Sequence, residues 1–246
     1  MIRLDKYLAD MGIGTRQEVK RYIRKGEVSL DGGVVKSPEH KVDPEKQEVC
    51  FRGKSVSYAQ FEYYMLNKPA GVISATEDRN DKTVIQCIES RKRKDLFPVG
   101  RLDKDTEGLL LITNDGALAH QLLSPKKHVD KVYYAKVEGR VTEETGQHFS
   151  RGVNIGTAEV PEMTLPARLE ILKSDDISEI RLTIQEGKYH QVKRMFASQG
   201  MKIIYLKRES MGPLVLDENL RPGDYRALNN QEIEWLCNSH SPELGE

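Results

Sequence analysis

Residues 98–116 combine a loop rich in carboxylates with a short apolar run. Asp103, Asp105 and Glu107 occupy alternate positions between two glycines, and the apolar residues 109–112 follow directly. An apolar run of this length, bounded by turn-forming residues, predicts a buried strand. We therefore expect the acidic loop to be anchored against the core, which is the arrangement that a functional site requires.

The residue types in this loop allow three interpretations. An acidic loop between glycines is commonly a solvated turn. The spacing of Asp103 and Asp105 also allows a magnesium site, because that ion prefers carboxylate oxygens. The third interpretation is catalysis by a carboxylate that attacks or stabilises a reacting centre. Spacing alone leaves the choice open.

Composition limits the class of protein. The chain has 246 residues, of which 38% are hydrophobic and 31% are charged, as in a polar globular protein. It contains no apolar run long enough to span a membrane and no signal-peptide core. Its three cysteines, Cys50, Cys87 and Cys237, form no C-x-x-C motif. The scattered cysteines predict a cytoplasmic protein without a zinc or redox motif. We also expect a monomer that needs no metal or other cofactor.

Charge is unevenly distributed along the chain, although the formal net charge is zero. Residues 1–54 contain 12 Lys and Arg against 9 Asp and Glu, whereas residues 214–246 contain 2 against 7. A net charge of zero argues against a uniformly basic RNA-coating protein. The asymmetry instead predicts a basic binding region near the N-terminus and an acidic tail.

The basic N-terminal region is expected to form a small separate module over residues 1–54. Thr15 followed by Glu18 is a capping box, which predicts a helix over residues 16–25. Three cations spaced by four residues lie on one face of that helix: Arg16, Lys20 and Arg24. Such a row suits contact with RNA phosphates, although a solvated amphipathic helix has the same pattern.

Several short motifs in this module resemble the S4 RNA-binding domain. They are Arg-Leu-Asp-Lys-Tyr-Leu-Ala from Arg3, Thr-Arg at Thr15, Gly-x-Val at Gly26 and Asp-Gly at Asp31. The resemblance implies a small αα-β module. It also implies RNA contacts at six positions: Arg3, Lys6, Thr15, Arg16, Lys20 and Lys25.

The acidic loop itself resembles the signature of pseudouridine synthases of the small-subunit rRNA type. The matching residues are Gly-Arg-Leu-Asp-x-Asp-Thr-x-Gly-Leu over 100–109. In that family the first aspartate is essential, so the resemblance implies a catalytic role for Asp103. A Lys-x-Tyr pattern implies the active-site tyrosine at Tyr133. The His-Gln-Val-Lys motif implies that Lys193 pairs with the catalytic aspartate, with Arg194 as the alternative cation.

The resemblance also implies how these residues act. The target uridine leaves its stack, because its reacting atoms are otherwise shielded. Tyr133 stacks on the flipped ring or helps to remove the C5 proton. Arg101 occupies the vacated space and, with Arg194, contacts RNA. A Leu-Asn-Lys-Pro-x-Gly motif, in which Pro69 and Gly71 shape a turn, implies structural support for the loop.

The order of elements predicts an α+β fold, because strands alternate irregularly with helices and show no βαβ rhythm. We expect a mixed, mainly antiparallel sheet with flanking helices over residues 61–236 and a disordered tail over 237–246. Predicted strands include 61–66, 72–74, 131–137, 153–155, 179–185 and 202–206. Predicted helices include 4–11, 84–89, 117–123, 141–151, 190–199 and 231–237.

The function implied by the resemblance is isomerisation of a uridine in 16S rRNA to pseudouridine, at uridine 516 of that RNA. The partner would be 16S rRNA or a small-subunit ribosomal precursor. Three alternatives remain: a non-catalytic RNA-binding or ribosome-assembly factor, a synthase that acts on large-subunit rRNA, and a metal-dependent nuclease or phosphotransferase that uses Asp103 and Asp105.

Overall fold

The computed structural model describes residues 1–124 and 127–238, which form two compact units. The first unit contains Met1–Glu62 and Glu89–Leu96, and the second contains Tyr63–Ile88 and the chain from Phe97 onward. Most of the tail for which disorder was predicted, residues 239–246, lies outside the described residues.

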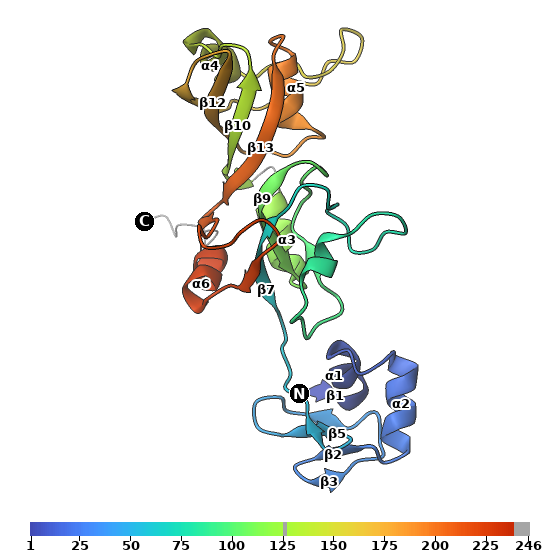
Figure 1. Cartoon of the computed structure of the whole chain (residues 1–246). Helices are drawn as coiled ribbons and strands as arrows, with labels where there is room; N and C mark the ends of the chain where they lie inside the picture. Colours follow the sequence, from blue (N-terminus) through green and yellow to red (C-terminus); the bar gives the residue numbers. More distant parts are fainter. Residues whose placement is uncertain (125–126, 239–246) are drawn as a thin grey trace. The chain divides into compact units, whose positions relative to one another are not determined.

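The first unit consists of two helices and short antiparallel strands (Figure 1). Helices α1 (Leu4–Asp10) and α2 (Arg16–Arg24) bury apolar side chains in one cluster, which includes Leu4, Leu8 and Ile23. The strands are β1 (Ile2–Arg3), β2 (Val28–Leu30), β3 (Gly33–Val34), β4 (Lys41–Val42), β5 (Val49–Phe51) and β6 (Lys54–Ser55).

Helix α2 begins as its sequence predicts. The Thr15 hydroxyl accepts a hydrogen bond from the Glu18 backbone N–H at 3.3 Å, and the Glu18 carboxylate accepts one from the Thr15 N–H at 2.8 Å. These bonds satisfy backbone donors that a helix N-terminus otherwise leaves free. The predicted capping box is confirmed.

The segment Glu89–Leu96 returns to the first unit from within the sequence of the second. The buried Arg93 holds it there, because its guanidinium lies 3.3 Å from the Asp10 carboxylate and pairs with Asp95. The predicted domain boundaries, 1–54 and 61–236, assign residues 89–96 to the second domain, and these boundaries stay predictions.

The second unit is built on a nine-stranded sheet in the order β11-β12-β10-β13-β9-β7-β15, with β14 beside β13 and β8 beside β9. Among the described strands, β9 and β13 pair in parallel and the other pairings are antiparallel. The strands are β7 (Tyr63–Lys68), β8 (Phe97–Pro98), β9 (Glu107–Thr113), β10 (Lys131–Glu138), β11 (Arg168–Lys173), β12 (Ile177–Ile184), β13 (Lys202–Met211), β14 (Leu214–Val215) and β15 (Tyr225–Ala227).

Helices flank this sheet, so the predicted α+β fold is confirmed. Figure 1 shows α4 and α5 beside the half that contains β10, β12 and β13, and α3 and α6 beside the half that contains β7 and β9. The helices are α3 (Gly116–Leu123), α4 (Glu143–Phe149), α5 (Gln191–Ala197), α6 (Asn230–Asn238) and the 3₁₀ helix η1 (Val84–Cys87).

The two halves of the sheet meet at Gly108. This glycine has a φ of 100°, and a Cβ atom placed on it would lie 2.2 Å from the Arg208 carbonyl oxygen. Only glycine permits both this backbone conformation and the close approach of β9 to β13. The acidic loop therefore enters the sheet at the point where its parallel strand pair forms.

Two predicted strands, 72–74 and 153–155, are wrong. Ile73 and Asn154 form isolated bridges to Thr83 and Met163, and neither segment extends into a strand. Each segment has only three residues, two of them β-branched, and so short a pattern gives no reliable strand signal without a neighbouring strand to pair with.

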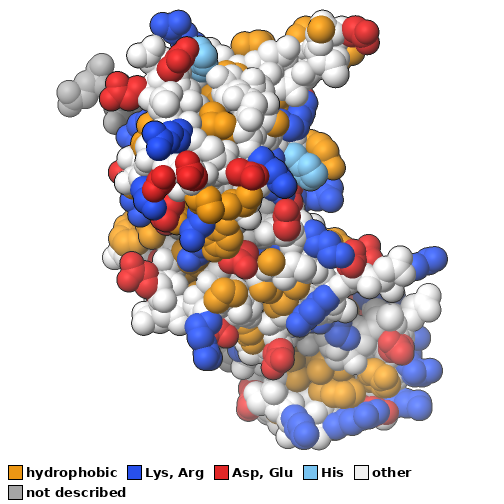
Figure 2. All heavy atoms as spheres, turned by 45° about the horizontal axis from the view of Figure 1, so that its top comes forward, with side chains coloured by type: hydrophobic (Ala, Val, Ile, Leu, Met, Phe, Trp, Pro, Cys, Tyr) orange, Lys and Arg blue, Asp and Glu red, His pale blue; other side chains and the backbone are white. Residues whose placement is uncertain are grey.

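The surface carries charges of both signs. On the face drawn in Figure 2, basic and acidic side chains are interspersed, which fits the formal net charge of zero. No helix in the described part of the chain is long and apolar enough to cross a membrane.

Candidate active site

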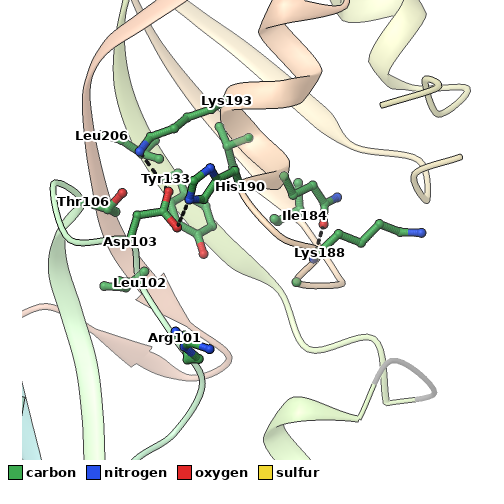
Figure 3. A pocket seen from close by; sticks show the side chains of 13 residues that line it. Arg101, Leu102, Asp103, Thr106, Tyr133, Ile184, Lys188, His190, Lys193 and Leu206 are labelled. Carbon is green, nitrogen blue, oxygen red and sulfur yellow. Dashed lines mark hydrogen bonds and ion pairs between the residues drawn. The ribbon is translucent and has the colours of Figure 1, made fainter. Parts of the chain in front are cut away.

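Asp103 lies on the loop that precedes β9, at the side of a pocket in the second unit. Its Oδ2 atom lies 2.9 Å from the Lys193 ammonium, and its Oδ1 atom lies 3.4 Å from the His190 Nε2 atom. Figure 3 shows both partners pointing toward the carboxylate from the region of α5. The Asp103 side chain is 23% exposed, so it is held by its partners and still accessible to a ligand.

Lys193 also contacts the second aspartate of the loop. Its ammonium donates a hydrogen bond of 2.6 Å to Asp105, whose side chain is 75% exposed. This hydrogen bond lowers the pKa of Asp105. Burial by itself lowers the pKa of Lys193, but the hydrogen bonds to Asp105 and Asp103 outweigh burial and raise the pKa. Lys193 is therefore held as a cation between two carboxylates.

The third acid of the loop has a different partner. Glu107, the first residue of β9, accepts a hydrogen bond of 2.8 Å from the Tyr205 hydroxyl on β13. This contact joins the two parallel strands. Of the three acids, Asp103 alone lines the pocket.

A buried lysine holds the backbone of the acidic loop in place. The Lys68 ammonium donates hydrogen bonds to the carbonyl oxygens of Pro69 at 3.0 Å, Lys104 at 3.2 Å and Thr106 at 2.8 Å. Burial lowers the pKa of Lys68 to about 8. The Gly71 N–H adds a bond of 2.7 Å to the Lys104 carbonyl oxygen. The loop is thus tied to the turn that follows β7.

The opposite wall of the pocket is largely apolar. It contains Tyr133 from β10, Ile184 from β12, Val192 from α5 and Leu206 from β13. The pocket encloses about 420 Å³, part of which is open to solvent. Figure 3 shows the Tyr133 ring behind Asp103. An open pocket with apolar walls and one carboxylate suits a flat, uncharged ring with a reactive atom near Asp103.

Comparison with known proteins identifies the family. Residues 62–198 match the family described as RNA pseudouridylate synthase, and residues 2–48 match the S4 domain. The chain belongs to the pseudouridine synthase family. Both resemblances read from the sequence are thereby confirmed.

Full-length relatives of this synthase agree with the assignment. The chain is 48% identical over 237 residues to the uncharacterized RNA pseudouridine synthase YtzG of Bacillus subtilis, covering 96% of this chain and 98% of that protein. It is 38% identical over 233 residues to ribosomal small subunit pseudouridine synthase A of Escherichia coli, covering 94% and 98%. A crystal structure of a pseudouridylate synthase, 39% identical, superposes with a TM-score of 0.65 and covers 96% of this chain and 100% of that one.

The structure separates the two cations that the family motif offered as partners of Asp103. Lys193 contacts Asp103, whereas the Arg194 guanidinium pairs with Glu162 at 2.6 Å and donates to the Ile155 carbonyl oxygen. Arg194 therefore braces a neighbouring loop. Arg101 lines the pocket with an exposed side chain, at the end of the loop away from Lys193 (Figure 3).

In the S4 domain of the synthase, three of the six predicted RNA-contact residues surround one buried carboxylate. Arg3 donates two hydrogen bonds to Asp5, at 3.1 and 3.0 Å. Arg16 and Lys20 lie 3.6 and 3.9 Å from the same carboxylate. Of the other three, Lys6 pairs with Asp10 at 3.7 Å, Thr15 caps α2, and Lys25 follows its last residue.

Sequence reasoning missed Lys68, His190 and Asp5 as parts of these sites. A signal existed for Lys68, because it closely follows a largely apolar strand segment and lies within the Leu-Asn-Lys-Pro-x-Gly motif, and a lysine that is buried there needs partners. For His190 the signal was its place at the start of the His-Gln-Val-Lys motif, in which only the lysine was given a role. The His190 backbone is left-handed, with a φ of 48°, at the N-cap of α5, and this conformation depends on the surrounding turn.

Proposed function

We propose that this synthase converts a uridine of small-subunit ribosomal RNA to pseudouridine, with Asp103 as the catalytic carboxylate. The observation that carries the proposal is the position of Asp103. The carboxylate lies at the side of a pocket with apolar walls, 2.9 Å from the ammonium of Lys193. The names of the relatives at about 40% identity support small-subunit rRNA as the substrate.

The reaction requires no change of composition or redox state. The C1′–N1 bond breaks, the uracil ring turns, and a C1′–C5 bond forms, while N1 gains a proton and C5 loses one. The chemistry therefore needs a carboxylate that attacks or stabilises a sugar or base centre. Lys193 places a positive charge 2.9 Å from Asp103, and Lys68 keeps the loop in place.

Tyr133 and the basic residues have supporting roles in this proposal. The Tyr133 ring stacks on the flipped uracil, and its hydroxyl is available to help remove the C5 proton. Arg101 occupies the space that the flipped base vacates. The S4 domain binds RNA phosphates through Arg3, Arg16 and Lys20, which adds affinity more than choice of base.

The target we propose is uridine 516 of 16S rRNA, either free or in a small-subunit precursor, modified in the cytoplasm by a monomeric enzyme without a metal. The test is to map pseudouridine in rRNA from cells with and without the gene. Purified protein should then restore the modification in vitro on a 16S transcript in the presence of EDTA.

The outcomes separate the alternatives. Loss of one pseudouridine in 16S rRNA, restored by the purified protein, supports the proposal. Loss in large-subunit rRNA would move the substrate to that RNA. Binding without any change in pseudouridine would indicate a non-catalytic factor. Activity that depends on a metal bound to the protein would favour the carboxylate pair Asp103 and Asp105 as a metal site.

A further inference from the structure

Tyr189 is the most exposed aromatic side chain in the described part of the chain, at 76%. Its ring does not pack into a core. It stacks instead on the imidazole of His190, with ring centroids 3.8 Å apart and an interplanar angle of 19°. The two rings form a flat two-layer platform that ends at the surface.

The turn that carries this platform is held firmly. The Arg194 guanidinium donates a hydrogen bond of 3.0 Å to the Tyr189 carbonyl oxygen. The Lys188 N–H donates to the Gln191 side-chain oxygen at 2.9 Å, and the Gln191 amide donates to Glu186 at 2.9 Å. These contacts hold His190 in its left-handed conformation. The turn is therefore held by several hydrogen bonds, and it presents the Tyr189 ring to solvent.

The platform lies next to the catalytic centre. The His190 Nε2 atom is 3.4 Å from Asp103, and His190 lines the pocket. The Tyr189 ring covers a face of that imidazole. Besides Lys193, the cationic side chains of Arg101 and Lys188 line the pocket. An aromatic face beside basic side chains is the combination that binds single-stranded RNA, because bases stack on the ring while cations meet the phosphates.

We propose that Tyr189, backed by His190, is the stacking platform for a nucleobase adjacent to the target uridine. This inference rests on the proposed function. When the target base leaves its stack, its neighbour loses a stacking partner. Arg101 occupies the vacated space, and the exposed ring of Tyr189 offers the neighbouring base a further stacking face. Every base has a π-face, so the platform favours RNA with an unpaired neighbour and does not select its identity.

The test uses a 16S rRNA transcript fragment that contains the mapped uridine. Two further versions carry an abasic nucleotide on the 5′ or the 3′ side of that uridine. Single-turnover kinetics gives the half-saturating protein concentration and the rate constant at saturation. The proteins are the wild type, Tyr189→Ala and Tyr189→Phe. Trp235→Ala serves as the matched control, because Trp235 is an exposed aromatic on α6 at 48%.

Tyr189→Ala should raise the half-saturating concentration about 5- to 150-fold, equivalent to ~1–3 kcal/mol, with little change in the saturated rate constant. Tyr189→Phe keeps the stacking face and should stay within about twofold of the wild type. One of the two abasic RNAs should weaken wild-type binding to a similar extent. The same RNA should produce no further loss with Tyr189→Ala.

The abasic series on the wild-type protein tests the proposal even if a variant folds poorly. Wild-type binding that is insensitive to both abasic sites would overturn the platform. Tyr189→Ala that lowers the saturated rate and leaves the half-saturating concentration unchanged would also overturn it, because Tyr189 would then only position His190. If the wild type formed no pseudouridine in any RNA, the proposed function would fail. The platform would then be judged by binding of the intact and abasic RNAs alone.

Discussion

Two carboxylates of this protein lie among basic side chains, and they differ in burial. Asp5 in the first unit is 0% exposed and contacts Arg3, Arg16 and Lys20. Asp103 in the second unit is 23% exposed and contacts Lys193 and His190. The side chains of the cations around Asp5 are 39–57% exposed, whereas at the second site the carboxylate of Asp103 is itself accessible.

The two clusters also differ in the ratio of acids to cations, which fits the different roles that we propose for them. Around Asp5, three cations face one buried carboxylate, and Arg3 also pairs with the exposed Glu39 at 3.4 Å. This leaves an excess of positive charge facing solvent, which suits phosphate contact. Around Lys193, two carboxylates share one ammonium, which leaves negative charge near the pocket and suits chemistry. Burial raises the pKa of Asp5 by itself, but the hydrogen bonds from Arg3 and the charge of Arg16 outweigh it and lower the pKa. The buried carboxylate of Asp5 therefore holds cations in place, whereas the accessible carboxylate of Asp103 can contact a ligand.

The largest effect should come from Asp103→Asn. The substitution is nearly isosteric, and the Lys68 bonds to the loop backbone remain, so the loop should keep its shape. Pseudouridine formation should fall below detection while RNA binding survives. Asp105→Asn removes one exposed charge-assisted bond to Lys193 and should lower the rate by less than about tenfold. Chemical mapping of pseudouridine and filter binding measure both variants side by side.

Equal loss in Asp103→Asn and Asp105→Asn would contradict this assignment. It would mean that the two carboxylates act as one unit through Lys193, which contacts both at 2.9 and 2.6 Å. Near-normal turnover of Asp103→Asn would remove Asp103 from the chemistry altogether.

Lys68→Met should have the next largest effect. It removes the donor that joins two carbonyl oxygens of the loop to one in the turn after β7. A displacement of a catalytic group by about 1 Å lowers a rate by roughly 10²-fold. RNA binding should change little. Lys131→Met is the matched control, because Lys131 is also buried, with its pKa lowered to about 8 by burial, and donates to the Val129 carbonyl oxygen.

The two lysine variants therefore distinguish support of the loop from the general consequence of removing a buried cation. Single-turnover rates on the same transcript measure this difference. If both variants lost activity equally, the bonds of Lys68 to the loop would have no special role.

The part of each site that could be predicted from the sequence depends on how far apart in the chain its contacting residues are. Helix α2 and its Thr15 cap depend on bonds between near neighbours, and both were predicted correctly. Lys193 was found through a motif, because 90 residues of chain separate it from Asp103 and no periodicity links them. The roles of Asp103, Tyr133 and Lys193 stay predictions until variants are measured.

The features that sequence reasoning missed depend on tertiary contacts. Asp5 resembles an ordinary acid in the first turn of a helix, and its burial appears only when α2 packs against α1. The segment Glu89–Leu96 is charged like a surface loop, yet Arg93 is buried against Asp10. A charge pattern does not reveal which charges are buried, because burial is decided by distant partners.

Asp5→Asn should act mainly on stability. The substitution removes the buried negative charge and replaces one of the two oxygens that accept hydrogen bonds from Arg3 with an NH₂ donor. The surrounding cations are partly solvated, so we expect a loss of ~1–3 kcal/mol in the free energy of unfolding. Because the pKa of Asp5 is lowered by folding, its contribution is present above the unfolded pKa of about 3.9 and is lost as pH falls through the folded pKa.

Chemical denaturation of Asp5→Asn and Asp103→Asn at pH 7 and at pH 3 measures this effect. The Asp5 variant should be less stable at pH 7, and the difference from the wild type should narrow at pH 3. The Asp103 variant should unfold within about 1 kcal/mol of the wild type. If Asp103→Asn lost more stability at pH 7 than Asp5→Asn, the proposed structural role of Asp5 and catalytic role of Asp103 would be contradicted.

The smallest effect should come from Lys20→Ala. Lys20 lies at the edge of the Asp5 cluster, 3.9 Å from the carboxylate and 39% exposed, so its loss should leave the fold intact. If it contacts one phosphate, the slope of log K against log salt should fall by about 0.7 for single-stranded RNA. Lys173→Ala is the control, because Lys173 is an exposed cation on β11 whose ion pair among the described residues is with Asp175, at 3.4 Å. The slope of log K against log salt should be the same for Lys173→Ala as for the wild type. An unchanged slope for Lys20→Ala would mean that this cation balances Asp5 within the S4 domain and does not reach the RNA.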